Sequence, residues 1–274
     1  MRAVIDMDLS EQSSDVEAQI GLLYDLDDVV HVHGSQIETT QGEHKIRQTL
    51  LDSVGQDVEQ CRTLLRTDTP SSQSLVDVRD PASLILDSDA TGRADLIVIG
   101  ARNLSWPARM FIGSVPSRSL RHSTMSTLIV KGDTRPVNRV LIAVQGPEDA
   151  NRLRTWLTGH PFKSSVTLTI LSVIYSPHMA SEHVMVEPDA LTEQRKRQAA
   201  QVVTDMARAL AGPHYTVTTA VLMGDPAKTI CGMGENHDLI VVSSDGRKGL
   251  SRFFMGSVSE SVAHQADRSV LLVR

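Results

Sequence analysis

Short apolar runs alternate with amphipathic stretches along the whole chain, and polar turn residues separate them. The clearest runs, at 96–99 and 239–242, are continuously apolar, which is typical of strands buried on both faces of a parallel sheet. Between the runs, apolar residues recur at helical spacing. One such stripe consists of Ala199, Val202, Val203, Met206 and Leu210. Strands that alternate with helices predict parallel sheets with right-handed crossovers.

The same order of elements is predicted twice. In the first half we expect strands at 3–8, 29–32, 74–78, 96–99 and 127–130. In the second half we expect them at 139–144, 166–173, 216–221, 239–242 and 270–273. The predicted helices of the first half begin near Ser14 as a capping box, run through an apolar stripe at 46–65, and begin again at 80 and 113. Those of the second half lie at 149–157 and 199–210 and begin again at Asp225 and Gly256.

One segment recurs at a fixed distance. Asp95-Leu-Ile-Val-Ile-Gly100 returns as Asp238-Leu-Ile-Val-Val-Ser243, and Gly113-Ser-Val returns as Gly256-Ser-Val, both 143 residues later (238 − 95 and 256 − 113). A repeat on this scale indicates a duplicated domain. The polar segment 131–136 carries Gly and Pro and is interpreted as the linker. We therefore expect one domain at 1–132 and another at 137–274.

Composition limits the classes of partner. The net charge of −6 and the isoelectric point of about 5.9 argue against general affinity for nucleic acid. No run approaches the ~20 apolar residues of a membrane span, and the first residues lack the apolar run of a signal peptide. The two cysteines, Cys61 and Cys231, lie one in each half and are expected to be reduced. These features favour a cytoplasmic protein.

The segment 243–259 is the best candidate for chemistry. It follows a predicted buried strand and leads into a helix whose first N–H groups, on Ser257, Val258 and Ser259, have no acceptor within the helix. With the helix dipole, these groups favour an anion such as phosphate. Gly246 and Gly256 would allow close approach of a ligand or a positive φ. The alternative is a simple glycine turn followed by a serine helix cap.

The two repeated segments resemble the motif of the universal stress protein family: Gly, two residues, Gly, nine residues, Gly, then Ser or Thr. Positions 243, 246, 256 and 257 are Ser, Gly, Gly and Ser, and positions 100, 103, 113 and 114 are Gly, Asn, Gly and Ser. The sequences around Asp8 and Gln145 resemble the end of the family's first strand, and Gly224-Asp-Pro-Ala227 resembles its Gly-x-Pro-Ala element. Over nearly its whole length, the chain is similar to a tandem universal stress protein.

The resemblance implies an α/β fold with two tandem Rossmann-like, HUP-type domains, each a five-stranded, mostly parallel sheet flanked by helices. One family branch binds ATP, and another lacks the site. In the binding branch, an Asp ending the first strand contacts the nucleoside, a Val ending the second contacts adenine, and the glycine motif holds the phosphates. The corresponding residues of the second half are Gln145, Val173, Gly246, Gly256, Ser257, Val258 and Ser259. Those of the first half are Asp8, Val32, Gly100, Gly113 and Ser114.

Each half departs from the family motif, and these departures indicate which half is the better candidate for nucleotide binding. In the second half, Gln145 keeps hydrogen-bonding capacity without a charge, and Ser243 adds a Cβ. In the first half, Asn103 replaces a glycine, Trp106-Pro107 stiffens the loop, and Pro116 lacks an N–H. We therefore expect the second half to hold ATP or another adenine nucleotide, and the first half to be the weaker site.

Metal and catalytic signals are weaker. Asp6 and Asp8 lie on one face of the first strand, which suits either Mg²⁺ beside a phosphate or a capping and solvated role. His31 and His33 also share a strand face, but no third ligand follows at metal-binding spacing, so an ordinary strand edge is favoured. The sequence has no Gly-x-Ser-x-Gly elbow and no Walker-type loop. We therefore expect no catalytic residues and at most slow ATP hydrolysis.

The leading hypothesis is a stress-response sensor or regulator that binds adenine nucleotide. The alternatives are a ligand-free interaction scaffold of the same fold and a slow ATPase. In single-domain relatives the apolar closing strands pair across a dimer. The resemblance therefore implies that the strands at 127–130 and 270–273 pair within this chain as a pseudo-dimer, covering both edges. A further homodimer and an unknown protein partner stay open.

Overall fold

The computed structural model describes residues 1–6, 12–34, 72–77, 83, 85, 94–101, 120, 122–175, 189–244 and 255–274. Among these residues, the N-terminal half includes the helix α1 (Gln12–Leu23) and five strands. The strands are β1 (Arg2–Asp6), β2 (Asp28–Gly34), β3 (Ser72–Asp77), β4 (Leu96–Gly100) and β5 (Ser126–Val130). Each overlaps a predicted strand. The stripe at 46–65 and the predicted helix starts at 80 and 113 lie outside the described residues.

The C-terminal half repeats this plan and is described almost throughout. Its strands are β6 (Arg139–Ala143), β7 (Val166–Tyr175), β8 (Tyr215–Gly224), β9 (Leu239–Ser243) and β10 (Ser269–Val273). Its helices are α5 (Pro147–Gly159), α6 (Asp189–Leu210), α7 (Pro226–Gly234) and α8 (Ser257–Gln265). All predicted elements of this half are present.

The first residues of the helices show where local sequence signals were enough to predict a helix start. Asp225 caps α7 as predicted, because its carboxylate accepts a 2.9 Å hydrogen bond from the backbone N–H of Lys228. By contrast, α1 begins at Gln12, two residues before Ser14, so the predicted capping box does not mark its start. Helix α5 begins at Pro147, two residues before the predicted start, since proline fits the first helical turn.

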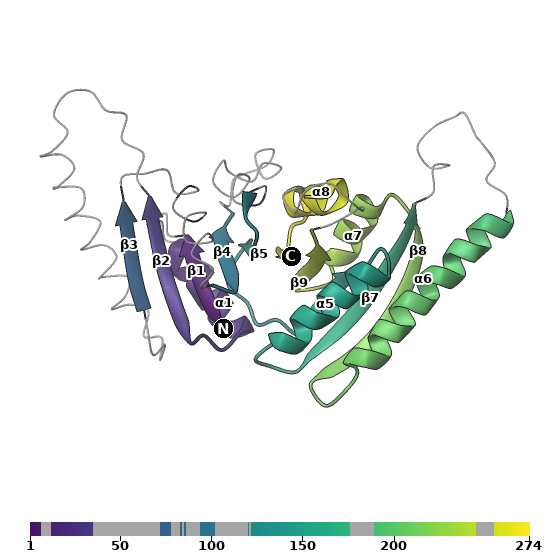
Figure 1. Ribbon diagram of the computed structural model, residues 1–274, viewed down its shortest axis with the longest axis horizontal. Coiled ribbons are helices and arrows are strands. Elements are labelled where there is room, and N and C mark those ends of the chain that lie inside the picture. The colour runs from purple at the N-terminus through teal and green to yellow at the C-terminus, as the bar shows by residue number, and fades with distance from the viewer. Residues whose placement is uncertain are drawn as a thin grey trace, which may run out of the picture.

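All ten strands form one sheet, in the order β3-β2-β1-β4-β5-β10-β9-β6-β7-β8 (Figure 1). Neighbouring strands within each half run parallel. The two halves therefore have the same strand order, counted from the outer edge to the middle. This arrangement confirms the predicted pair of five-stranded α/β domains.

The two halves meet where β5 and β10 pair antiparallel, with Ile129 opposite Val270 and Thr127 opposite Leu272. Every residue of both strands is buried. The backbone N–H of Lys131 donates to the Ser269 hydroxyl at 3.0 Å, beside the end of this pairing. The predicted pairing of the two closing strands within one chain is therefore present, and it leaves neither strand as an open edge.

The segment between the halves is held firmly to α1. The Gln19 amide donates to the backbone oxygen of Arg135 at 3.0 Å and accepts from the Arg135 N–H at 2.9 Å. The hydroxyl of Thr134 donates to the Asp15 carboxylate at 3.0 Å. Because Gln19 is itself buried, these bonds fix the position of the linker relative to the N-terminal half.

The helices divide between the two faces of the sheet. Side chains of α1, α5 and α6 share one apolar core that runs across both halves, whereas α7 and α8 pack in a second core on the other face of the C-terminal half. Tyr24 from the first half stacks on Phe162 from the second, with ring centroids 5.5 Å apart. The first core therefore helps to join the halves, in addition to the strand pairing.

Candidate functional site at the strand ends of the C-terminal half

The strand order of the C-terminal half reverses between β6 and β9. From β6 the chain continues outward through β7 and β8, and then returns to β9 on the other side of β6. In open parallel sheets, ligands bind at the carboxyl ends of the strands beside such a reversal. The residues that follow β6, β7 and β9, and the start of α8 after β9, are therefore the candidate site.

The start of α8 has the properties that an anion site requires. Gly256 is its N-cap residue, so the N-cap position makes no side-chain cap hydrogen bond. The Ser259 hydroxyl instead donates to the Gly256 backbone oxygen at 2.9 Å. Ser257 and Val258 are exposed. Within the described part of the chain, the N-cap residue therefore leaves the first N–H groups of the helix without a side-chain cap, and these groups can face an anion.

The glycine of this start has an ordinary backbone. Gly256 has φ −67° and ψ 148°, which any residue can adopt, so a positive φ does not explain the glycine. Its N–H donates to the Ser244 backbone oxygen at 2.8 Å, which brings the two ends of the intervening loop together. Gly246 lies outside the described residues.

A cation lies at the end of β9. Nη1 of Arg152, on α5, donates to the Ser243 hydroxyl at 2.7 Å and lies 3.9 Å from the Asp149 carboxylate. The other oxygen of Asp149 accepts a 3.3 Å hydrogen bond from the backbone N–H of Gln145. Sequence reasoning missed Arg152 and Asp149. The signal for Asp149 was an acid in the first helical turn, whereas nothing in the sequence marks Arg152.

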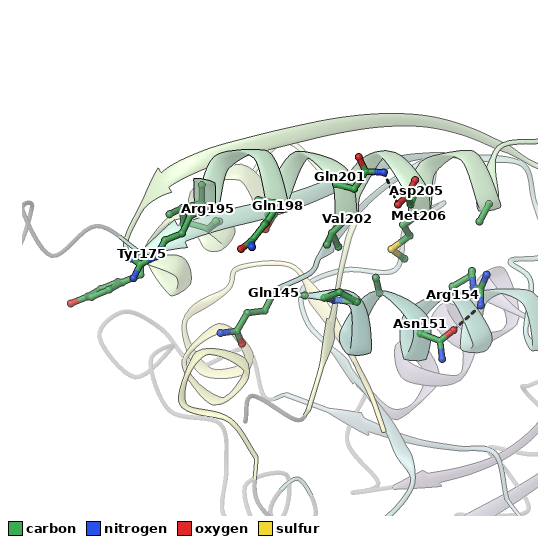
Figure 2. A pocket seen from close by; sticks show the side chains of 18 residues that line it. Gln145, Asn151, Arg154, Tyr175, Arg195, Gln198, Gln201, Val202, Asp205 and Met206 are labelled. Carbon is green, nitrogen blue, oxygen red and sulfur yellow. Dashed lines mark hydrogen bonds between the residues drawn. The ribbon is translucent and has the colours of Figure 1, made fainter. Parts of the chain in front are cut away.

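A cavity of about 840 Å³ opens beside these strand ends, between α5 and α6 (Figure 2). Gln145 and Val173, both predicted from the family resemblance, line it together. The Val173 side chain also packs against the core on the α7–α8 face. The described residues at the start of α8, from Gly256 to Ser259, are not part of the lining. Of the predicted nucleotide-binding residues that the structure describes in this half, the cavity lining therefore contains Gln145 and Val173 but not the start of α8.

In the first half, the predicted residues that can be located have packing roles. Val32 is fully buried in a small apolar core with Ile97 and Ile99. A Cβ on Gly100 would come within 2.9 Å of a methyl carbon of Val16, so a glycine is required there for packing against α1. Asp8, Gly113 and Ser114 lie outside the described residues, as does Cys61.

The structure gives a packing or hydrogen-bonding role to the other candidate residues that it describes. Nε2 of His31 lies 3.0 Å from the carboxylate of Glu17, and both side chains are buried, so this imidazole is held by an acid inside the fold. Cys231 is a free thiol whose pKa is raised by burial. Within the described ranges, no cluster of three metal-ligating side chains occurs. None of the helices described there is long and apolar enough to cross a membrane.

Comparison with known proteins gives a consistent family assignment. The model of the universal stress protein family matches the chain twice, at residues 7–131 and 136–274. A universal stress protein of Mycobacterium tuberculosis is 27% identical over 237 residues, which cover 82% of this chain and 75% of that protein. One from Mycolicibacterium smegmatis is 25% identical over 191 residues, 68% of this chain, and the match spans 64% of that relative's length.

Solved structures agree on the fold. The crystal structure of a universal stress protein from Archaeoglobus fulgidus superposes with a TM-score of 0.62 at 20% identity, covering 99% of this chain and 95% of that one. At this identity the likeness shows the fold alone. Together with the two matches to the family model, it accounts for the duplicated sheet and the repeated motif. The chain belongs to the universal stress protein family, with one family unit in each half.

Proposed function

We propose that this protein is a stress-response regulator that binds an adenine nucleotide at the β6, β7 and β9 strand ends of its C-terminal half. Family membership supports a role in the stress response. The start of α8 carries the nucleotide part of the proposal, because an exposed helix start without a side-chain cap follows β9 next to the reversal of strand order.

Each group has a separate role in this proposal. The N–H groups of Ser257 and Val258 bind phosphate oxygens, and Arg152 supplies positive charge at the end of β9. Gln145 faces the nucleoside through its amide, and Val173 supplies an apolar contact at the cavity edge. Mg²⁺ would accompany the phosphates as their counter-ion. The role is binding and signalling, with hydrolysis at most slow.

A matched pair of glycine variants tests the proposal. ATP binding to the full chain is measured by calorimetry for wild type, Gly256→Val and Gly212→Val. Gly212 lies in the turn between α6 and β8, where an added Cβ meets no atom within 4 Å. We expect Gly256→Val to abolish binding, since its side chain covers the helix start, and Gly212→Val to bind like wild type.

The small molecules that copurify with the chain provide an independent measurement. The protein is denatured, and the released compounds are separated on an anion-exchange column with mass detection. Adenine nucleotide near one per chain would support a single working site. No recovered nucleotide, together with no rise in melting temperature on adding ATP, would overturn the proposal and favour the ligand-free scaffold.

A further inference from the structure

The cavity between α5 and α6 changes character along its length. Four apolar side chains of α6 that line it follow one stripe of the helix, at spacings of three, four and three residues: Ala199, Val202, Met206 and Ala209. At 1.5 Å per residue, the stripe extends about 15 Å. Figure 2 shows Val202 and Met206 pointing from α6 towards α5. This part of the cavity is therefore a long groove with an apolar stripe on its α6 side.

The opposite end of the cavity is polar. Gln145, Tyr175, Arg195 and Gln198 line it near the carboxyl end of β7, and Figure 2 shows them grouped at this end. The other end also carries polar groups, since Asn151, Arg154 and Gln201 line it together with Asp205, which accepts a 2.8 Å hydrogen bond from the Gln201 amide (Figure 2). Asp205 is the one acid among the described lining residues, so the acid lies at the Arg154 end and away from Arg195.

A buried hydroxyl opens into this polar end. Ser172 is 3% exposed and lines the cavity. It lies on the same face of β7 as Leu168 and Ile170, whose side chains pack in the core beneath α5 and α6. Among the described residues, its side chain makes no hydrogen bond. Its oxygen is not one of the fully buried polar atoms left without a partner, so it is reached from the cavity, where a ligand oxygen would accept its hydrogen bond.

We propose that this groove binds a long-chain carboxylic acid. The carboxylate lies at the polar end, where the Arg195 guanidinium attracts it and the Ser172 hydroxyl donates to it. The alkyl chain extends along Ala199, Val202 and Met206 towards Ala209, removing its methylenes from water. A nucleobase would leave most of the 15 Å apolar stripe uncovered, whereas an extended chain covers it. This site does not depend on nucleotide binding.

One consequence links the two proposals and rests on the proposed function. Gln145 and Val173 line the cavity and also belong to the predicted nucleoside site. A carboxylate at the polar end would therefore exclude the nucleoside, so that the acid and ATP compete. If the acid and ATP both bind but do not compete, only the predicted competition is wrong. Loss of ATP binding alone would overturn the proposed function and leave the groove proposal standing.

The first test uses a substitution that fills the groove. Binding of saturated C8, C12 and C16 carboxylic acids to the full chain is measured by calorimetry for wild type, Val202→Phe and Thr204→Phe. Thr204 is exposed on α6 outside the lining, so it controls for adding a phenyl ring to this helix. We expect affinity to rise up to about fourfold per buried methylene, and Val202→Phe to lose at least tenfold for C12 while Thr204→Phe matches wild type.

The second test addresses the head group. Arg195→Gln should weaken binding of the C12 acid about tenfold and leave binding of the uncharged C12 alcohol unchanged, whereas Arg197→Gln should change neither. Ser172→Ala should weaken the acid without lowering the melting temperature, because the hydroxyl it removes has no partner in the described structure. Absence of binding at every chain length, or equal affinity of the two phenylalanine variants, would overturn the proposal.

Discussion

The hydroxyl oxygen of Ser243 accepts a 2.7 Å hydrogen bond from Nη1 of Arg152, at the strand position where the first half of the chain has Gly100. Gly100 ends β4 and lies against Val16 of α1, as Ser243 ends β9 and lies against Arg152 of α5. At the end of this strand, the first half therefore places a glycine against Val16, and the second half places a serine against Arg152. The glycine thus meets an apolar side chain of α1, whereas the serine meets a basic side chain of α5.

The packing role of Gly100 can be tested directly. Gly100→Ala should lower the free energy of unfolding by about 1–3 kcal/mol, because the new Cβ would lie 2.9 Å from a Val16 methyl carbon in a well-packed core. Urea denaturation measures the change. In the double variant with Val16→Ala, the effect of Gly100→Ala should become smaller than in wild type. Simple additivity of the two changes would show that the two side chains do not compete for this space.

A substitution of Arg152 tests whether the contact between Arg152 and Ser243 contributes to ligand binding. If the guanidinium assists phosphate binding, Arg152→Gln should weaken ATP by roughly tenfold, or about 1.4 kcal/mol. Calorimetry gives the affinity. Arg208→Gln is the control, since Arg208 is an exposed arginine of α6 that pairs with Asp205. Equal affinities for the two variants would assign Arg152 a structural role at the end of β9.

Much of the fold could be predicted from sequence because its signals are local. Continuous apolar runs such as 239–242 mark strands covered on both faces, and the Asp225-Pro226 pair marks a helix start. Predicting the join between the halves needed the family resemblance in addition, since no local signal shows which edges pair. The start of α1 was placed wrongly, because Ser14 and Glu17 fit a capping box that this helix does not use; Glu17 is buried against His31.

The site was harder to predict because its parts come from different elements. A motif identifies residues near one another in sequence, such as Gly256 and Ser257. It cannot show that Arg152 of α5 reaches Ser243 of β9, a contact that depends on how helix and strand pack. The cavity was also missed, since it arises from small side chains on facing helices, Ala150 on α5 and Ala199 on α6, that in sequence resemble ordinary core positions.

Lys131 is a structural cation that joins the linker to α8. Its ammonium donates to the backbone oxygens of Ala263 and Ala266, both at 2.7 Å, at the end of the helix. Lys131→Met should lower the free energy of unfolding by about 2 kcal/mol, since it leaves buried carbonyl groups without a donor. Lys163→Met, which removes an exposed ion pair with Asp25, should cost under ~0.5 kcal/mol in the same urea titration.

The same lysine predicts a pH dependence. Burial lowers the pKa of Lys131 from 10.5 to about 8, while Cys231 and Asp267 act in the opposite direction. Between pH 8 and 10.5 the unfolded chain therefore binds more protons at this group than the folded chain, and the free energy of unfolding rises with pH. We expect the stability of wild type relative to Lys131→Met to increase from pH 7 to pH 10. A constant or falling difference would show that the carbonyl oxygens keep the ammonium charged despite its burial.

Phe162 joins the two halves through aromatic contacts. It is almost fully buried, stacks on Tyr24 of the first half, and meets Tyr215 of the second half edge-on at 6.2 Å. Phe162→Ala should lower the free energy of unfolding by about 3–5 kcal/mol, the usual cost of such a cavity. Because the ring contacts both halves, the variant should also speed hydrogen exchange along the β5–β10 pairing.

The conservative change separates packing from backbone effects. Phe162→Leu retains much of the buried volume and should cost less than half as much as the alanine variant. Mass-spectrometric hydrogen exchange over residues 126–130 and 269–273 reports the pairing. If Phe162→Ala destabilises the chain but exchange along these strands matches that of wild type, the strand pairing alone holds the halves together. Faster exchange in the alanine variant, and an intermediate rate in the leucine variant, would show that the aromatic contacts and the strand pairing act together.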